Sequence, residues 1–186
     1  MVTIDSLGSQ MCRRNFGTAV IPPVMDLDPT DHALIDAVQR DASQRLEDLA
    51  RLVGLAPSSV HDRLRRLERE GVIRRWTVDV DAAAFGLHVL AFVGVRSSRP
   101  CAELVGAFEA IEAIEECHSV AGGQSLLLKV RVATPAALLG VVDRLRQISG
   151  VEGTETSIVL KTQIERPVAL PKLPLPPRTR RRGSQP

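Results

Sequence analysis

The chain of 186 residues is poor in aromatic side chains, with four Phe, one Trp and no Tyr. Proteins that bind single-stranded nucleic acid stack its bases on exposed aromatic rings. This scarcity therefore argues against such a stacking platform. Hydrophobic residues still make up 44% of the chain, enough for one or two domains that each bury a core.

Cysteine is also scarce and shows neither Cys-x-x-Cys pairing nor a metal-binding spacing. The three residues, Cys12, Cys101 and Cys117, predict reduced thiols in a cytoplasmic protein. No apolar run approaches the roughly 20 residues that a membrane-spanning helix needs, so no membrane partner is expected. Residues 1–26 contain no continuous apolar stretch, and we interpret them as a flexible extension rather than an export signal.

Positive charge is concentrated at two places in this chain of net charge +2. Residues 166–186 contain six basic residues and no acidic one, and their Pro- and Arg-rich composition predicts a disordered tail. The rest of the chain is consequently acidic overall, which does not favour binding by bulk attraction to phosphate. The second concentration comprises six arginines within thirteen residues: Arg63, Arg65, Arg66, Arg69, Arg74 and Arg75.

Residues 46–67 predict two short helices joined by a sharp turn. Gly54 lies where the first helix must end, a position that favours a residue tolerating positive φ. Pro57 suits the first turn of the second helix, because its missing N–H has no partner there in any case. The apolar residues of the second helix recur at i, i+4 and i+7: Val60, Leu64 and Leu67.

Polar and basic residues of the second helix lie outside this apolar stripe. The arrangement is typical of a helix-turn-helix, whose second helix enters a DNA major groove. The candidate DNA-binding residues are Ser58, Ser59, His61, Asp62, Arg63, Arg65, Arg66 and Arg69. Two alternatives stay open: a plain helical hairpin with solvated arginines, or arginines paired with Glu68 or Glu70 on the same helix.

The flanking segments extend this motif into a domain. Asp28 followed by Pro29 predicts the start of a preceding helix, with Asp28 as its N-cap. Residues 72–80 have the β-branched and aromatic content of strands, which would form a wing. We therefore predict a winged helix-turn-helix domain over residues 27–80, followed by a linker over 81–86.

Residues 87–165 show the order strand, helix, strand, strand, helix, strand. The predicted strands cover 87–96, 115–120, 126–132 and 151–161, and the predicted helices 101–113 and 135–149. This order is that of a ferredoxin-like βαββαβ domain, which makes the fold class α+β. One sheet face stays open, and we expect an apolar patch there for a second subunit, although the same residues could fill the subunit's own core: Leu90, Phe92, Leu126, Leu128, Ile158 and Leu160.

This two-domain combination resembles the Lrp/AsnC family of leucine-responsive, or feast/famine, bacterial transcription regulators. The similar stretches are Leu27-Asp28, residues 50–60 (ARLVGLAPSSV), 63–68 (RLRRLE), 71–73 (GVI) and 116–122 (ECHSVAG). The resemblance implies a sequence-specific regulator of amino-acid metabolism genes that is no enzyme and needs no cofactor. It also implies homodimers that assemble into tetramers or octamers. The high ratio of arginine to lysine adds a weaker similarity to actinobacterial regulators of alanine dehydrogenase.

The resemblance implies a free amino acid as effector, bound at dimer–dimer contacts and altering the assembly. The family's effector loop, Ser-Gly-Asp-x-Asp, corresponds here to residues 121–125, where Gly123 and Ser125 replace both aspartates. Main-chain N–H groups can still receive a carboxylate, but a charge partner for the ammonium is lost. The implied effector residues are His118, Val120, Ala121, Gly122, Gly123, Gln124, Ser125, Ser157, Ile158 and Val159. Without the resemblance, Gly122-Gly123 predicts only a hairpin turn.

Two further functions stay open from the sequence. One is an architectural DNA-binding protein that responds to no effector. The other is an enzyme similar to sirohaem decarboxylases, which share the two-domain plan, with His118 as proton donor. A smaller departure from the family lies at Ala56, where relatives often have a serine that caps the recognition helix; such a cap is worth about 1 kcal/mol.

Overall fold

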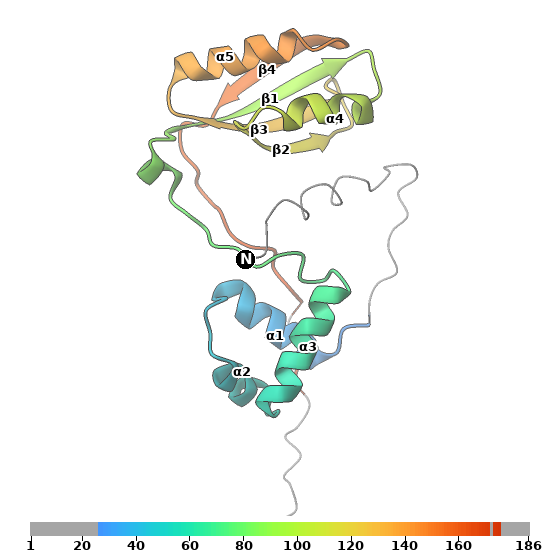
Figure 1. Ribbon diagram of the computed structural model, residues 1–186, viewed down its shortest axis with the longest axis vertical. Coiled ribbons are helices and arrows are strands. Elements are labelled where there is room, and N and C mark those ends of the chain that lie inside the picture. Colours follow the sequence, from blue (N-terminus) through green and yellow to red (C-terminus); the bar gives the residue numbers. More distant parts are fainter. Residues whose placement is uncertain (1–25, 172, 176–186) are drawn as a thin grey trace, which may run out of the picture. The chain divides into compact units, whose positions relative to one another are not determined.

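The computed structural model describes residues 26–171 and 173–175, which fall into two compact units (Figure 1). Of the described residues, the helical unit comprises 26–79, 164–171 and 173–175, and the sheet unit comprises 80–163. The predicted N-terminal extension lies outside the described residues except for Asp26, as does residue 172 and the tail from 176 onward. No helix in the described ranges is long and apolar enough to cross a membrane.

The helical unit contains α1 (Pro29–Arg40), α2 (Leu46–Val53) and α3 (Pro57–Arg69). The predicted start of α1 is confirmed: the Asp28 side chain accepts a hydrogen bond from the Asp31 N–H, and the Asp31 side chain accepts one from the Asp28 N–H. Gly54 ends α2 in the left-handed region with φ 72°. Ala56 provides no side-chain cap for α3, as its sequence position indicated.

Apolar side chains from all three helices meet in one small core. Its fully or nearly fully buried members are Leu34, Ala37, Val38, Leu49, Ala50 and Val60. The stripe predicted for α3 is thereby confirmed, with Val60 and Leu67 fully buried and Leu64 partly so. The opposite side of α3 stays exposed to solvent.

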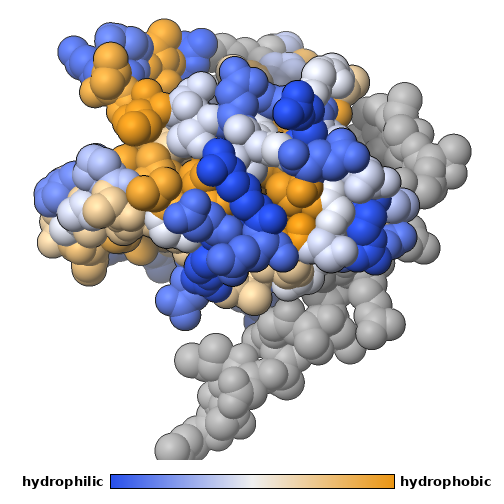
Figure 2. Space-filling view, turned by 90° about the horizontal axis from the view of Figure 1, so that it is seen from above, coloured by the Kyte–Doolittle hydropathy of each residue, from blue (hydrophilic) through white to orange (hydrophobic). Residues whose placement is uncertain are grey.

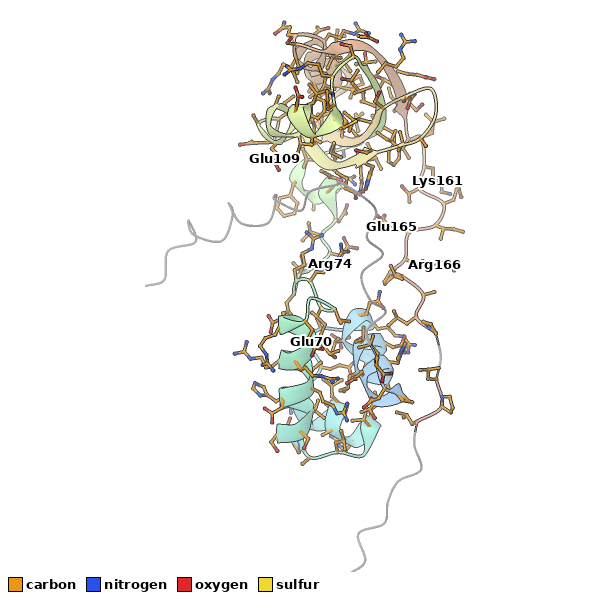
Figure 3. The ribbon with its side chains drawn as sticks, turned by 90° about the vertical axis from the view of Figure 1, so that its right-hand side faces the viewer. Glu70, Arg74, Glu109, Lys161, Glu165 and Arg166 are labelled. Carbon is orange, nitrogen blue, oxygen red and sulfur yellow. The ribbon has the colours of Figure 1, made fainter. Side chains whose placement is uncertain are left out.

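The strands expected at residues 72–80 do not form, so this part of the prediction is corrected. α3 gives way to Gly71 at φ 74°, and the chain then runs without regular structure through Arg74 (Figure 3). A strand needs a neighbour to receive its backbone hydrogen bonds, and no segment in the described part of the chain pairs with this one. Its apolar side chains are left exposed: Trp76, Val78 and Val80.

The segment at the start of the predicted disordered tail is hydrogen-bonded within the helical unit. The Gln39 side-chain amide donates a hydrogen bond of 3.1 Å to the Val168 carbonyl. The chain reaches this contact through an extended stretch that includes Lys161, Glu165 and Arg166 (Figure 3).

The sheet unit begins with a short 3₁₀ turn (Ala82–Phe85) in the predicted linker and continues in the predicted βαββαβ order. The strands are β1 (Val89–Ser97), β2 (Ile114–Ser119), β3 (Leu126–Val132) and β4 (Val151–Ile158); the helices are α4 (Cys101–Glu109) and α5 (Pro135–Arg146). The strands form an antiparallel sheet in the order β2-β3-β1-β4, and both helices cover one face (Figure 1). This is the expected ferredoxin-like arrangement.

The helix-covered face of the sheet contains the larger core. Alternate residues of β1 and β3 point toward the helices, including Val93, Val95 and Leu128, and pack against Leu104 and Phe108 of α4. The outer surface of this unit displays hydrophilic side chains interspersed with apolar ones (Figure 2). Leu126 and Leu128 are fully buried in this core, so they do not belong to a patch for a second subunit.

The open face of the sheet is more charged than expected. A register shift between Ile114 and Glu116 places the carboxylates of Glu115 and Glu116 on the same face, where both contact Lys129. Arg131 also pairs with Glu115. Of the predicted apolar patch, Phe92 is 37% exposed on this face. Ile158 pairs with Ala91 and therefore points to the helix side, although it is half exposed.

Candidate functional site

The predicted DNA-binding residues separate into two groups on α3. Six of them are exposed and point away from the core: Ser58, Ser59, His61, Asp62, Arg65 and Arg69. The other two, Arg63 and Arg66, are partly buried and turn toward the N-terminus of α1. The sequence could not separate these groups, because helical periodicity places all eight outside the apolar stripe.

Arg63 and Arg66 hold α3 against α1 through acidic residues. Arg63 Nη1 lies 2.6 Å from Asp28 Oδ2 and 2.8 Å from Asp31 Oδ1, and Arg66 pairs with the other Asp31 oxygen. The Asp31 side chain is 1% exposed, so both of its oxygens are satisfied inside the protein. We call Asp28, Asp31, Arg63 and Arg66 the helix clamp.

Protonation of the helix clamp follows from these contacts. Burial alone would raise the pKa of Asp28, but hydrogen bonds from the Asp31 N–H and Arg63 outweigh it and lower that pKa. Burial likewise works against the charge of Arg63, and the two aspartates outweigh it and raise the pKa of Arg63. Both shifts favour the charged forms of Asp28 and Arg63 at neutral pH.

The exposed arginines of α3 remain available to a partner. Arg65 lies 3.5 Å from Glu68 on the same helix, a contact at the weak end of the range, and its side chain is 63% exposed. The ion pair between Arg65 and Glu68, which the sequence left open as an alternative, therefore forms. Arg66 also lies 4.0 Å from Glu70, whereas Arg69 has no ion pair within the described part of the chain. Guanidinium groups such as these can bind phosphate or guanine.

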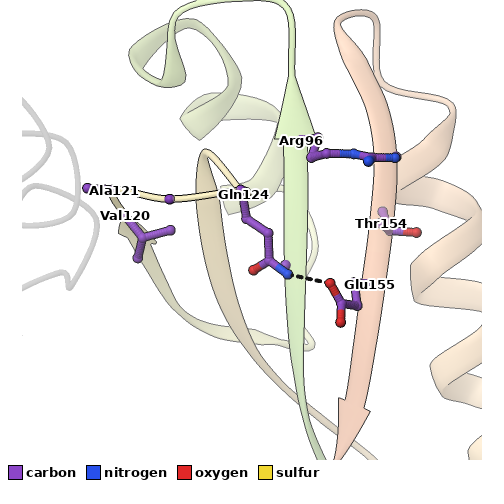
Figure 4. Close-up of a pocket in the computed structure, with 10 residues that line it drawn as sticks. Arg96, Val120, Ala121, Gln124, Thr154 and Glu155 are labelled. Atoms are coloured by element: carbon purple, nitrogen blue, oxygen red, sulfur yellow. Dashed lines mark hydrogen bonds between the residues drawn. The ribbon is translucent and has the colours of Figure 1, made fainter.

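The sheet unit contains a pocket of about 360 Å³ at one end of the open face (Figure 4). Five of the predicted effector residues line it: Val120, Ala121, Gly122, Gly123 and Gln124. These residues form the connection between β2 and β3, which lies beside β1 and β4. The Gln124 amide donates a hydrogen bond of 2.9 Å to Glu155 Oε2 across this pocket.

The other five predicted effector residues lie outside the pocket lining. Ser125 closes the connecting loop instead: its N–H donates to the Val95 carbonyl, and its hydroxyl accepts from the Ser97 N–H. His118 lies on β2, where its Nε2 is 2.9 Å from Glu116. Ser157 and Ile158 occupy the far end of β4, and the Val159 N–H donates to the Leu90 carbonyl just beyond it.

Sequence reasoning missed the side of the pocket formed by β1 and β4. The missed lining residues are Gly94, Arg96, Gly153, Thr154 and Glu155. The predicted topology places the first and last strands next to each other, but the register Gly94↔Glu155 and Arg96↔Gly153 is not encoded in any local pattern. A signal was present in the period-2 alternation of Gly94 and Arg96 along β1.

The titratable side chains on β2 and β3 of the sheet unit either pair with each other or stay in their unreactive form. Hydrogen bonds from His118 and Lys129 lower the pKa of Glu116, and Glu116 in turn raises the pKa of Lys129. Burial, with smaller contributions from Cys101 and Glu109, raises the pKa of the Cys117 thiol, which therefore stays protonated. Among the described residues, no cluster of His, Cys, Asp and Glu is arranged to hold a metal ion.

Comparison with known families matches both units. Residues 27–74 match a family described as winged helix-turn-helix DNA-binding, and residues 90–169 match the Lrp/AsnC ligand binding domain. The chain is 34% identical over 142 residues to the HTH-type transcriptional regulator FL11 of Pyrococcus abyssi, covering 76% of this chain and 94% of that protein. It is 36% identical over 138 residues to the HTH-type transcriptional regulator LrpA of Mycobacterium tuberculosis, covering 73% and 91%.

Solved structures show the same likeness. A feast or famine regulatory protein from M. tuberculosis, complexed with L-methionine, matches with a TM-score of 0.74 and 34% identity over 78% of this chain and 99% of that one. The AsnC protein of E. coli matches with a TM-score of 0.71 and 25% identity over 76% and 97%. The chain, with its exposed recognition helix and its ligand-binding sheet domain, therefore belongs to the Lrp/AsnC family of DNA-binding transcriptional regulators.

Proposed function

We propose that the exposed side of α3 reads promoter DNA, with Ser58, Ser59, His61 and Asp62 near base edges and Arg65 and Arg69 on phosphate or guanine. The observation that supports this is the division of charge on α3. Arg63 and Arg66 hold α3 against α1 on one side, and the six other polar side chains are exposed on the solvent side of the same helix. A preorganised helix loses little freedom on entering the groove.

The proposal assigns the helix clamp a positioning role rather than direct contact. Arg63 and Arg66 would have to leave Asp31 unpaired and buried in order to reach DNA, which costs several kcal/mol. They therefore orient the recognition helix from behind.

Substitution of Arg65 by alanine tests the contact. We expect Arg65→Ala to weaken binding to a cognate operator about tenfold, because a bidentate arginine–guanine pair contributes about 1–3 kcal/mol of base discrimination. The loss of a phosphate contact would also lower the salt dependence of binding. A gel-shift titration at two salt concentrations measures both effects. Arg144→Ala, which removes the same charge from α5, is the matched control and should bind like the unchanged protein.

An unaltered operator affinity for Arg65→Ala, with the fold intact by circular dichroism, would remove Arg65 from the contact list. If the unchanged protein bound operator and random DNA equally tightly, sequence-specific regulation itself would be wrong. The architectural alternative would then hold for the helical unit.

The finer function is control of amino-acid metabolism genes by a free amino acid bound in the β1–β4 pocket. A structural relative is complexed with L-methionine, and the pocket here has the polar lining that such a zwitterion needs. We propose that binding alters the association of homodimers into tetramers or octamers and thereby promoter occupancy in the cytoplasm. Analytical ultracentrifugation with and without amino acid tests this, and an unchanged assembly would contradict it.

The proposed regulator is not an enzyme and carries no cofactor. His118, the proton donor that a decarboxylase would need, is tied to Glu116 and lies outside the pocket lining. Absorbance spectroscopy with added tetrapyrrole should show no complex. A shifted tetrapyrrole spectrum would revive the enzymatic alternative.

A further inference from the structure

The pocket carries two opposite charges on adjacent strands. Arg96 projects from β1, and Glu155 projects from β4 on the same open face of the sheet, because Gly94 pairs with Glu155 and Arg96 pairs with Gly153. Figure 4 shows the Arg96 side chain crossing from β1 toward β4. Neither residue lies in the loop where the family resemblance places the ligand.

The side chains of Arg96 and Gln124 each lie close to a glycine, whose missing side chain makes room for them. A Cβ added at Gly153 would lie 2.6 Å from Arg96 Nη2, too close for the guanidinium to stay in place. A Cβ added at Gly94 would lie 2.0 Å from Gln124 Cδ. The two missing side chains therefore create the space in which Arg96 and Gln124 lie over the sheet.

The neutral side-chain amide of Gln124 donates a hydrogen bond to the carboxylate of Glu155 in the pocket. Its Nε2 donates to Glu155 at 2.9 Å, so the carboxylate is satisfied without a cation (Figure 4). Arg96, by contrast, makes no ion pair with any residue that the structure describes. The pocket thus offers an available guanidinium and, across it, a carboxylate held only by a displaceable amide.

We propose that Arg96 and Glu155 bind the carboxylate and the ammonium of a free α-amino acid, and that Gln124 is a built-in competitor which the ammonium displaces from Glu155. This inference depends on the proposed effector function and specifies how the same pocket recognises its ligand. Glu155 supplies, from β4, the negative charge that the effector loop lacks at Gly123 and Ser125. An ammonium donates to a carboxylate more strongly than an amide does, which drives the exchange.

Two chemical consequences follow from this pairing. An amine that lacks the carboxylate, or a carboxylic acid that lacks the amine, satisfies only one of the two charges and should bind at least tenfold more weakly than the parent amino acid. Removing the competitor should tighten binding, because the ligand no longer has to break the bond between Gln124 and Glu155.

Isothermal titration calorimetry on the full chain tests the proposal with each of the twenty amino acids, starting with L-methionine. We expect Glu155→Gln and Arg96→Gln each to weaken binding at least tenfold, and Gln124→Ala to tighten it about fivefold. Gln124→Met keeps most of the bulk but loses the hydrogen bond, and separates loss of the bond from gain of space. Lys129→Gln, on the same sheet face but outside the pocket lining, is the charge-matched control.

Full affinity in both charge variants would overturn the proposal, as would weaker binding by Gln124→Ala. If no amino acid binds the unchanged chain, Gln124→Ala is titrated with the same panel, and absence of binding there also overturns it. Thermal melting verifies that each variant is folded. A gel shift without amino acid is the separate test of DNA binding: its failure would contradict the proposed function, whereas the calorimetry would still decide the role of Arg96 and Glu155.

Discussion

The two units of the chain use charge in opposite ways. In the helical unit, the buried Asp31 binds two arginines that are more than thirty residues away in sequence, and the pairs hold helices together. In the sheet unit, Glu116 and Lys129 pair on an accessible face above a complete core. The described residues of the helical core include six buried apolar residues, against thirteen in the sheet core. The smaller core needs polar contacts to hold its helices together. The larger core is stable through apolar packing, so the charged side chains of the sheet unit are not needed for that purpose.

The largest difference between the two units should appear when one large core residue is truncated in each. Leu34→Ala in the helical core and Leu128→Ala in the sheet core each lose a fully buried side chain, at about 3 kcal/mol of unfolding free energy. The same loss is a larger share of the stability of the smaller unit. We expect Leu34→Ala to abolish operator binding at 37 °C and Leu128→Ala to retain it, as measured by gel shift and calorimetry. Equal loss of DNA binding would contradict the difference between the units.

The helix clamp should be worth more than the ion pairs on the sheet. Asp31→Asn leaves Arg63 and Arg66 without their buried acid, and we expect a loss of about 2 kcal/mol, because the arginines are partly exposed. Glu116→Gln, its counterpart on the sheet, should cost less than about 1 kcal/mol. Urea denaturation followed by circular dichroism compares the two. A larger loss for Glu116→Gln would reverse the assignment.

Acid should weaken both sets of charges. The pKa values of Asp28 and Glu116 are lowered in the folded protein, from ordinary values of 3.8 and 4.5. Their stabilisation is therefore fully present above those ordinary values and disappears as the pH falls through the lower, folded-state pKa. Melting temperatures between pH 2.5 and pH 6 measure the loss. Asp28→Asn should reduce the fall of the melting temperature at acidic pH for the helical unit alone. An equally steep fall in this variant would contradict the proposed stabilisation by the helix clamp.

The smallest expected change is a gain. Ala56→Ser introduces a side-chain oxygen at the uncapped start of α3 and should stabilise the helical unit by about 1 kcal/mol. Thermal denaturation detects the shift. Thr134, which already caps α5 by accepting from the Ala137 N–H, provides the reverse control, since Thr134→Ala should lose a similar amount from the sheet unit. No gain from Ala56→Ser would mean that Pro57 already satisfies this helix start.

Much of the fold could be predicted because its signals are local. The N-cap at Asp28, the left-handed Gly54 and the strand over residues 126–132 all agree with the structure. The wing could not be settled in this way, because Trp76 and Val78 have strand-forming side chains but no hydrogen-bonding neighbour in the described chain. Local propensity indicates what a segment favours, and pairing decides whether it forms.

The candidate site could be predicted only where its residues follow a local motif. The loop over residues 120–124 follows from the family motif, and the structure places it in a pocket. Arg96 and Glu155 enter that pocket only through the register between β1 and β4, which depends on how the whole sheet pairs. The open face was likewise predicted as apolar, because the register shift that brings Glu115 and Glu116 to one side leaves no mark in the sequence.

The amino-acid sequence by itself determined the helix starts and stops, the order of strands and the resemblance to the regulator family, since each depends on neighbours within a few residues. Only the tertiary structure decided which charges are committed and which are available. Arg63 and Arg65 are equivalent by composition and spacing, yet the first meets Asp31 and the second faces solvent. Ion pairing depends on distance in space, and for these side chains the packing of α1 against α3 sets that distance.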